Sequence, residues 1–120
     1  MILADTSVWI QHFRKADPAF KSLLDRNQIA MHPLVIGELA CGNLTDRSQT
    51  LADLGKMHQV QQANHVEVMH LIETHALLGR GLGSIDLHLL ASARLSHAPL
   101  LTRDQRLATV AAELDVSAQL

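Results

Sequence analysis

The chain has 120 residues, of which 48% are apolar, and these values predict one compact domain spanning residues 1–120. No apolar run reaches the ~20 residues of a membrane span, and residues 1–4 lack the basic start of a secretory signal, so we expect a cytoplasmic protein. A single cysteine excludes an internal disulfide framework. Ten Lys and Arg against twelve Asp and Glu give a net charge of −2, which excludes a strongly basic nucleic-acid binder.

Short apolar runs alternate with helix-like segments along the chain. Strands are predicted at residues 2–4, 29–31 and 99–102, with a weaker one around residues 57–61. Helices are predicted to begin near residues 6, 18, 33, 46 and 84, and apolar residues at helical spacing mark two more over residues 68–78 and 107–114. This alternation predicts an α/β sandwich around a mostly parallel sheet.

Polar residues stand where these helices begin and are predicted to cap them. A cap accepts hydrogen bonds from the free N–H groups of the first turn, a task that suits Ser, Thr, Asp and Asn. The predicted caps are Thr6 or Ser7, Asp17 before Pro18, Asp46, and Ser84.

Two aspartates follow predicted strands directly. Asp5 ends the first strand, and Asp104 lies just past the strand that contains Leu100 and Leu101. In open α/β sheets ligands collect outside the carboxyl ends of the strands. Because neighbouring strands lie ~4.8 Å apart, both carboxylates would be within reach of one ion if these strands are adjacent.

Sorting the twelve acidic residues by context leaves four unexplained. Eight are accounted for as helix caps or as members of predicted polar faces. The remaining four are embedded in apolar sequence: Asp5, Glu38, Asp86 and Asp104. Clustered carboxylates repel one another and either bind protons more tightly or recruit a metal, and a hard dication such as Mg²⁺ or Mn²⁺ prefers their oxygens.

A purely structural role is possible for some of these acids taken singly. Asp86 lies near the start of a predicted helix, where the helix dipole favours a negative charge. Asp104 has the position of an N-cap. The four acids together are a stronger signal than any one of them.

The segments around these acids resemble the PIN domain. They are Ile-Leu-Ala-Asp-Thr-Ser at residues 2–7, Gly-Glu-Leu-Ala at 37–40, Gly-Ser-Ile-Asp-Leu at 83–87 and Leu-Thr-Arg-Asp at 101–104. The short chain and the Gly-Arg-Gly-Leu-Gly stretch at residues 79–83 are similar, more narrowly, to VapC-type toxins of bacterial toxin–antitoxin pairs.

The resemblance implies a three-layer α/β/α fold and a Mg²⁺- or Mn²⁺-dependent endoribonuclease. It places the acidic motif positions on the four acids named above, and the small hydroxyl residues of the motifs on Ser7 (or Thr6) and Thr102. It also implies a homodimer inhibited by a cognate VapB-type antitoxin. Many relatives carry a further acid shortly after the last one, whereas residues 105–108 here are Gln-Arg-Leu-Ala, so a second metal ion would have fewer ligands.

Four arginines are candidates for binding the RNA backbone, because a planar guanidinium matches phosphate oxygens. Each is equally well explained as solvated surface charge. They are Arg80, Arg94, Arg103 and Arg106.

Two other functions fit parts of the sequence. An aspartate that ends the first strand can accept a phosphoryl group, but Ser7 stands where such phosphatases usually carry a second aspartate. A catalytically silent module that binds RNA or protein would keep the fold alone, and the intact set of four acids argues against it.

Overall fold

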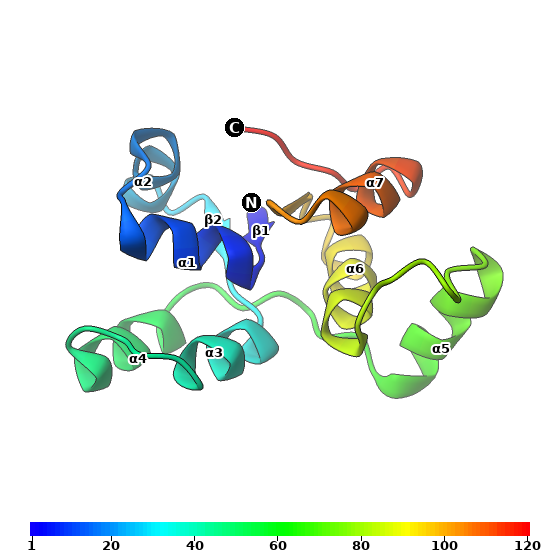
Figure 1. The fold of residues 1–120 in the computed structure, drawn as a ribbon, viewed down its shortest axis with the longest axis horizontal. Helices are drawn as coiled ribbons and strands as arrows, with labels where there is room; N and C mark the ends of the chain where they lie inside the picture. Colours follow the sequence, from blue (N-terminus) through cyan, green and yellow to red (C-terminus); the bar gives the residue numbers. More distant parts are fainter.

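The computed structural model describes residues 1–120 as seven helices and a three-stranded parallel sheet (Figure 1). The strands are β1 (Ile2–Ala4), β2 (Ile29–Ala30) and β3 (Leu100–Leu101), in the spatial order β2-β1-β3. The weaker strand predicted around residues 57–61 contributes only one parallel bridge, from Gln59 to Met31. That segment has few apolar side chains to bury, since only Met57 and Val60 are apolar.

The helices flank the strands in two groups. Figure 1 shows the helices of the first half of the chain, up to residue 55, on one side of the sheet and those that follow on the other, so the predicted α/β/α sandwich is confirmed. In chain order they are α1 (Thr6–Arg14), α2 (Pro18–Asp25), α3 (Pro33–Ala40), α4 (Arg47–Gly55), α5 (His65–Thr74), α6 (Ser84–Ser96) and α7 (Gln105–Glu113).

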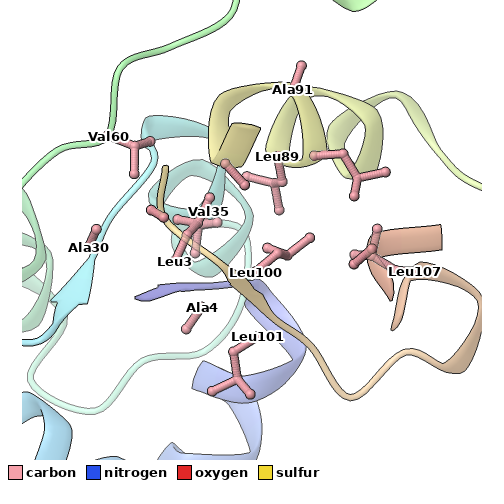
Figure 2. Close-up of a cluster of buried hydrophobic side chains, with 14 of the residues drawn as sticks. Leu3, Ala4, Ala30, Val35, Val60, Leu89, Ala91, Leu100, Leu101 and Leu107 are labelled. Carbon is pink, nitrogen blue, oxygen red and sulfur yellow. The ribbon is translucent and has the colours of Figure 1, made fainter. Parts of the chain in front are cut away.

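Buried apolar side chains from the sheet and both groups of helices form one cluster of 27 residues. Figure 2 shows Leu3 of β1 and Leu100 of β3 in this cluster with Val35, Leu89 and Leu107 from α3, α6 and α7. Leu3 is fully buried, and truncating such a side chain to alanine costs about 2–5 kcal/mol. The core therefore holds the carboxyl ends of β1 and β3 in a fixed position.

The helix predicted over residues 68–78 ends four residues early, so that prediction was wrong at its end. Ala76 has a left-handed backbone (φ 51°), which stops α5, and the chain then turns back. The N–H of Leu77 donates to Ile72 (3.0 Å), and Leu77 is buried. Leu78, predicted to continue the apolar stripe, is 71% exposed.

The predicted caps are right at some helices and wrong at others. Asp17 caps α2 as predicted, with Oδ1 accepting from Ala19 N (2.9 Å). Asp46 precedes α4 but its side chain makes no capping hydrogen bond.

At the other two helices the cap lies earlier in the chain than predicted. Asp5 caps α1, in place of Thr6 or Ser7, because its carboxylate reaches the N–H of Val8. Gly83 is the N-cap residue of α6, in place of Ser84. None of the helices combines the length and apolar composition that crossing a bilayer would require.

Candidate metal centre and its surroundings

The register of the sheet brings Asp5 beside Thr102. Ala4, the last residue of β1, pairs with Leu101, the last residue of β3. The next residue along β1 continues the ladder, since Asp5 N donates to Leu101 O (3.0 Å). Asp5 and Thr102 therefore leave the carboxyl ends of two adjacent parallel strands, where α/β proteins place their ligands.

Asp5 is 5% exposed, and both of its carboxylate oxygens accept hydrogen bonds. Oδ1 accepts from Ser7 Oγ (2.5 Å) and from Val8 N (3.2 Å), and Oδ2 accepts from Thr102 Oγ1. These donors fix the orientation of the carboxylate. Two of the three hydroxyl residues expected beside the site, Ser7 and Thr102, thus contact Asp5 directly.

Asp104 is joined to Asp5 through Thr102. Its N–H donates to Thr102 Oγ1 (3.0 Å), so one hydroxyl group bonds to both aspartates. As the N-cap of α7, Asp104 uses Oδ1 to accept from Arg106 N (2.9 Å) and Leu107 N (3.1 Å). Asp104 therefore does cap a helix. Its Oδ2 accepts no hydrogen bond from the chain.

Glu38 projects from α3 and is exposed, although its apolar neighbours in the sequence suggested partial burial. The next residue of the helix, Leu39, is the one buried in the core. The side chain of Glu38 therefore lies on a more exposed face of α3. Its Oε1 accepts from the hydroxyl of Thr6 (2.5 Å), the third expected hydroxyl residue. This bond ties α3 to the start of α1.

Asp86 lies in the first turn of α6 and is half-buried, with Oδ2 accepting from Gly83 N (3.1 Å). Burial is the main cause that raises the pKa of Asp86, while the Gly83 hydrogen bond lowers it. The negative charges of Asp104, Asp5 and Glu38 raise that pKa further. Asp86 is therefore close enough to interact electrostatically with three acids that come from three other segments.

None of the four acids forms an ion pair with a cationic side chain. The ion pairs of the chain are Lys21 with Asp25 and Arg80 with Glu113, and neither includes any of the four acids. Partly buried carboxylates without a cationic partner are unfavourable, and a bound dication relieves that cost.

The four acids do not form a closed ligand cage. No three His, Cys, Asp or Glu side chains lie close enough together, as they stand, to hold an ion directly. This arrangement still suits Mg²⁺, which keeps several of its waters and binds proteins through one or two carboxylates. The donor type and the uncompensated charge fit a hard dication.

The four candidate RNA-binding arginines have different surroundings. Arg80 pairs with Glu113 through two hydrogen bonds, and Arg94 Nη1 lies 2.8 Å from His75 Nε2. The guanidinium of Arg106 lies against the backbone of Gly81. Arg103 follows Thr102 at the rim of the site and makes no ion pair.

The sequence interpretation missed His32, which follows β2 at the same edge of the sheet. Its Nδ1 accepts from Leu34 N (3.0 Å) and so caps α3, the helix that carries Glu38. Burial, with a smaller effect of His88, lowers the pKa of His32 to about 4, so the ring is neutral at pH 7. Its Nε2 is buried without a partner. The position between a predicted strand and Pro33 was the available signal.

A groove with polar and apolar walls lies beside Glu38. It encloses about 370 Å³ between α1, α3 and the segment that leads to α4, and its lining includes Glu38, Ile10 and Phe13. Ile10 is 41% exposed and Phe13 is 45% exposed. Apolar side chains this exposed, rimmed by polar groups, are typical of an interaction surface.

Comparison with known proteins decides the family. The PIN domain family matches residues 2–113, which include all four acids. The chain belongs to the PIN-domain family. This PIN domain is also 45% identical, over 118 residues, to proteins called Ribonuclease VapC32 from two strains of Mycobacterium tuberculosis, CDC 1551 / Oshkosh and ATCC 25618 / H37Rv. The alignment covers 98% of this chain and 95% of each relative, which confirms the resemblance to VapC-type proteins.

A solved structure confirms the fold independently. The crystal structure of PAE2754 from Pyrobaculum aerophilum superposes with a TM-score of 0.58 and covers 95% of this chain and 88% of that one. At 18% sequence identity this likeness speaks for the fold alone.

Proposed function

We propose that this PIN domain is the toxin of a toxin–antitoxin pair and acts as a metal-dependent endoribonuclease that hydrolyses RNA phosphodiester bonds. The observation that carries the proposal is the environment of Asp86, whose carboxyl group feels three further carboxylates and no cation. The 45% identity with a protein named as a ribonuclease supports RNA as the substrate.

The residues that would hold Mg²⁺ or Mn²⁺ are Asp5, Asp86 and Asp104, with Glu38 contributing directly or through a water. When bound there, such an ion activates a water for attack on the phosphodiester and offsets the charge that develops on the phosphate. The hydrogen bonds already present leave this role open. A carboxylate oxygen has two lone pairs, and Oδ2 of Asp5 and of Asp86 each accept one hydrogen bond, while Oδ2 of Asp104 accepts none.

The surrounding residues keep the acids in place. Ser7 and Thr102 hold the buried carboxylate of Asp5 from its two oxygens, and Thr6 holds Glu38. Three of the four acids also bond the N–H groups at the start of a helix: Asp5 at α1, Asp86 at α6 and Asp104 at α7. These bonds fix the orientation of the three carboxylates.

The decisive experiment compares two Asp→Asn variants on a labelled structured RNA, with EDTA and with Mg²⁺ or Mn²⁺. Asp5→Asn should abolish cleavage, whereas Asp17→Asn, at the matching cap position of α2, should leave it intact. Equal cleavage by the wild type and Asp5→Asn would reject the site. Calorimetry with Mn²⁺ adds a second readout: a catalytically silent binding module would bind little metal and cut no RNA.

The groove beside Glu38 supports the antitoxin partner. An antitoxin segment with apolar side chains would cover Ile10 and Phe13, and a basic side chain from it would be attracted to the acids. The test is co-purification of the protein encoded next to this gene. Phe13→Glu should weaken the complex at least tenfold without lowering RNA cleavage by the free toxin.

The homodimer is proposed on apolar side chains that α5 exposes. Val66 is 73% exposed and Met69 43% exposed, beside a groove of about 580 Å³ between α5 and α6. Sedimentation velocity at several concentrations tests this, and Val66→Glu should shift the protein to a monomer. A wild-type protein that remains a monomer would disprove it.

A further inference from the structure

The segment between α5 and α6 carries an unusual pair of glycines. Gly79 and Gly81 both have a left-handed backbone (φ 70° and 79°) and they flank Arg80. Glycine adopts this conformation without a steric cost, so the pair allows the backbone to turn within residues 79–83. The same turn ends at Gly83, whose N–H donates to Asp86 Oδ2 (3.1 Å).

Helix α7 contacts this turn through Glu113. Arg80 Nη1 donates to Glu113 Oε2 (3.0 Å) and Nη2 donates to Oε1 (2.8 Å), a parallel bidentate arrangement. The pair raises the pKa of Arg80 and lowers the pKa of Glu113, with the hydrogen bonds as the leading cause in each. This geometry is the most specific that a guanidinium and a carboxylate can form.

A second contact joins the turn to the other end of α7. The side chain of Arg106 lies so close to Gly81 that a Cβ added there would meet Arg106 Nη1 at 2.8 Å. Arg106 and Glu113 are seven residues apart, or about two helical turns, and so lie on one face of α7. The turn is therefore contacted near both ends of this face of α7, by Arg106 at one end and by Glu113 at the other.

These contacts between the turn and α7 connect the segments of two proposed metal ligands. Asp104 is the N-cap of α7, and Gly83 leads from the turn directly into Asp86. The contacts between the turn and α7 therefore join the two segments that carry these carboxylates.

We propose that Arg80 is a positioning residue, which together with Glu113 clasps residues 79–83 onto α7 and so sets the spacing of Asp86 and Asp104 for the metal. This inference rests on the proposed function and deepens it. It assigns Arg80 to the architecture of the site, in place of the direct contact with RNA that the sequence alone suggested.

Exchanging the charges of Arg80 and Glu113 distinguishes a positioning role of Arg80 from direct contact with RNA. Arg80→Glu and Glu113→Arg each put like charges together, so each should weaken Mn²⁺ binding about three- to tenfold. We expect a smaller loss than for buried residues that support a metal, because this ion pair is exposed. The double variant restores an ion pair with reversed polarity. It should bring Mn²⁺ affinity and kcat back to within about twofold of wild type.

An Arg80 that instead contacts RNA gives a different pattern. The double variant would still lack a cation at position 80, so its KM for RNA would stay raised while Glu113→Arg alone left KM unchanged or lowered. That pattern would overturn the proposal, as would normal Mn²⁺ affinity in both single variants. Exchanging the exposed ion pair of Lys21 and Asp25 on α2 is the matched control and should change nothing.

A further readout needs neither metal nor RNA. In the metal-free protein the Gly83 amide should exchange hydrogen faster in each single variant and recover in the double variant. Unchanged exchange would count against the clasp. If the wild type cut no RNA, the proposed function would fail, and this measurement would still decide whether Arg80 and Glu113 hold the turn. Circular dichroism confirms that each variant is folded.

Discussion

The hydroxyl group of Thr102 donates a hydrogen bond to Asp5, 97 residues earlier in the chain, and accepts one from the N–H of Asp104. One side chain thereby connects the acid that follows β1 to the acid that caps α7. Its place follows from the parallel register of Ala4 with Leu101, because the next residue of each strand is then also adjacent.

Replacing Thr102 tests this connection. Thr102→Val keeps the shape of the side chain but leaves Asp5 Oδ2 and the N–H of Asp104 without their partner, which should lower the free energy of unfolding by about 1–3 kcal/mol. Urea titration measures that loss, and RNA cleavage should fall at least tenfold. Thr102→Ser retains the hydroxyl and should keep most of both. Equal stability of the Val and Ser variants would contradict the role of the hydroxyl.

Asp86 should destabilise the metal-free protein at neutral pH. Its pKa is raised in the folded state, mainly by burial, so the folded protein binds the proton more tightly and stability falls as the pH rises above the unfolded pKa of 3.8. Asp86→Asn should therefore melt at a higher temperature than wild type at pH 7, and this advantage should shrink towards pH 3.

Added Mg²⁺ should reverse that order. The ion should raise the melting temperature of the wild type, because it binds the folded state, and leave that of Asp86→Asn nearly unchanged. A wild type whose melting temperature does not respond to Mg²⁺ or Mn²⁺ would argue against a metal at these acids.

His32 predicts an acid-sensitive stability. Because its folded pKa is about 4 and the unfolded value is 6.5, only the unfolded chain takes up this proton between those pH values. Stability present above pH 6.5 should be lost on acidification to pH 4, by about 3 kcal/mol at 1.36 kcal/mol for each pH unit.

The matched variants separate this effect from general acid unfolding. His32→Asn keeps a capping side chain for α3 and should show a shallower dependence of unfolding free energy on pH between 4 and 6.5. His97→Asn, at an exposed left-handed position that asparagine tolerates, is the control and should keep the wild-type slope. Identical slopes for all three proteins would exclude a buried neutral His32.

Arg103 and Arg94 should differ in RNA binding. Arg103→Gln, at the rim of the acids, should weaken RNA binding about three- to tenfold and reduce the salt dependence by about one counterion. Arg94 is bonded to His75 and lies eight residues along α6 from Asp86, about 12 Å of helix, so Arg94→Gln should leave binding unchanged. Filter binding at several salt concentrations measures both variants. Equal losses would mean that RNA covers a wider face.

The local pattern of residues was enough to predict the architecture. The apolar runs ending at Asp5 and just before Asp104 are strands β1 and β3, and the helix after Asp17 and Pro18 begins where predicted. The order of the four acids along the chain also predicted the family. Prediction from local pattern succeeds here because strand burial and helix capping depend on residues only a few positions apart.

Local pattern failed where a distant contact decides the outcome. The apolar spacing through Leu78 continued the helical period, yet the chain turns at Ala76 and buries Leu77 instead. Nothing near His32 in the sequence states that its ring is enclosed, since burial depends on how the elements pack around it.

By itself, then, the sequence determined which residues are available: four acids in apolar surroundings, three small hydroxyl residues beside them, and an α/β alternation that brings strand ends together. Only the tertiary structure decided which of them meet. Asp5 bonds to Thr102 because β1 and β3 are adjacent and in register, and Arg80 pairs with Glu113, 33 residues away, because two glycines turn its backbone towards α7. Such contacts form between segments far apart in the chain, and no periodicity of the sequence encodes their distances.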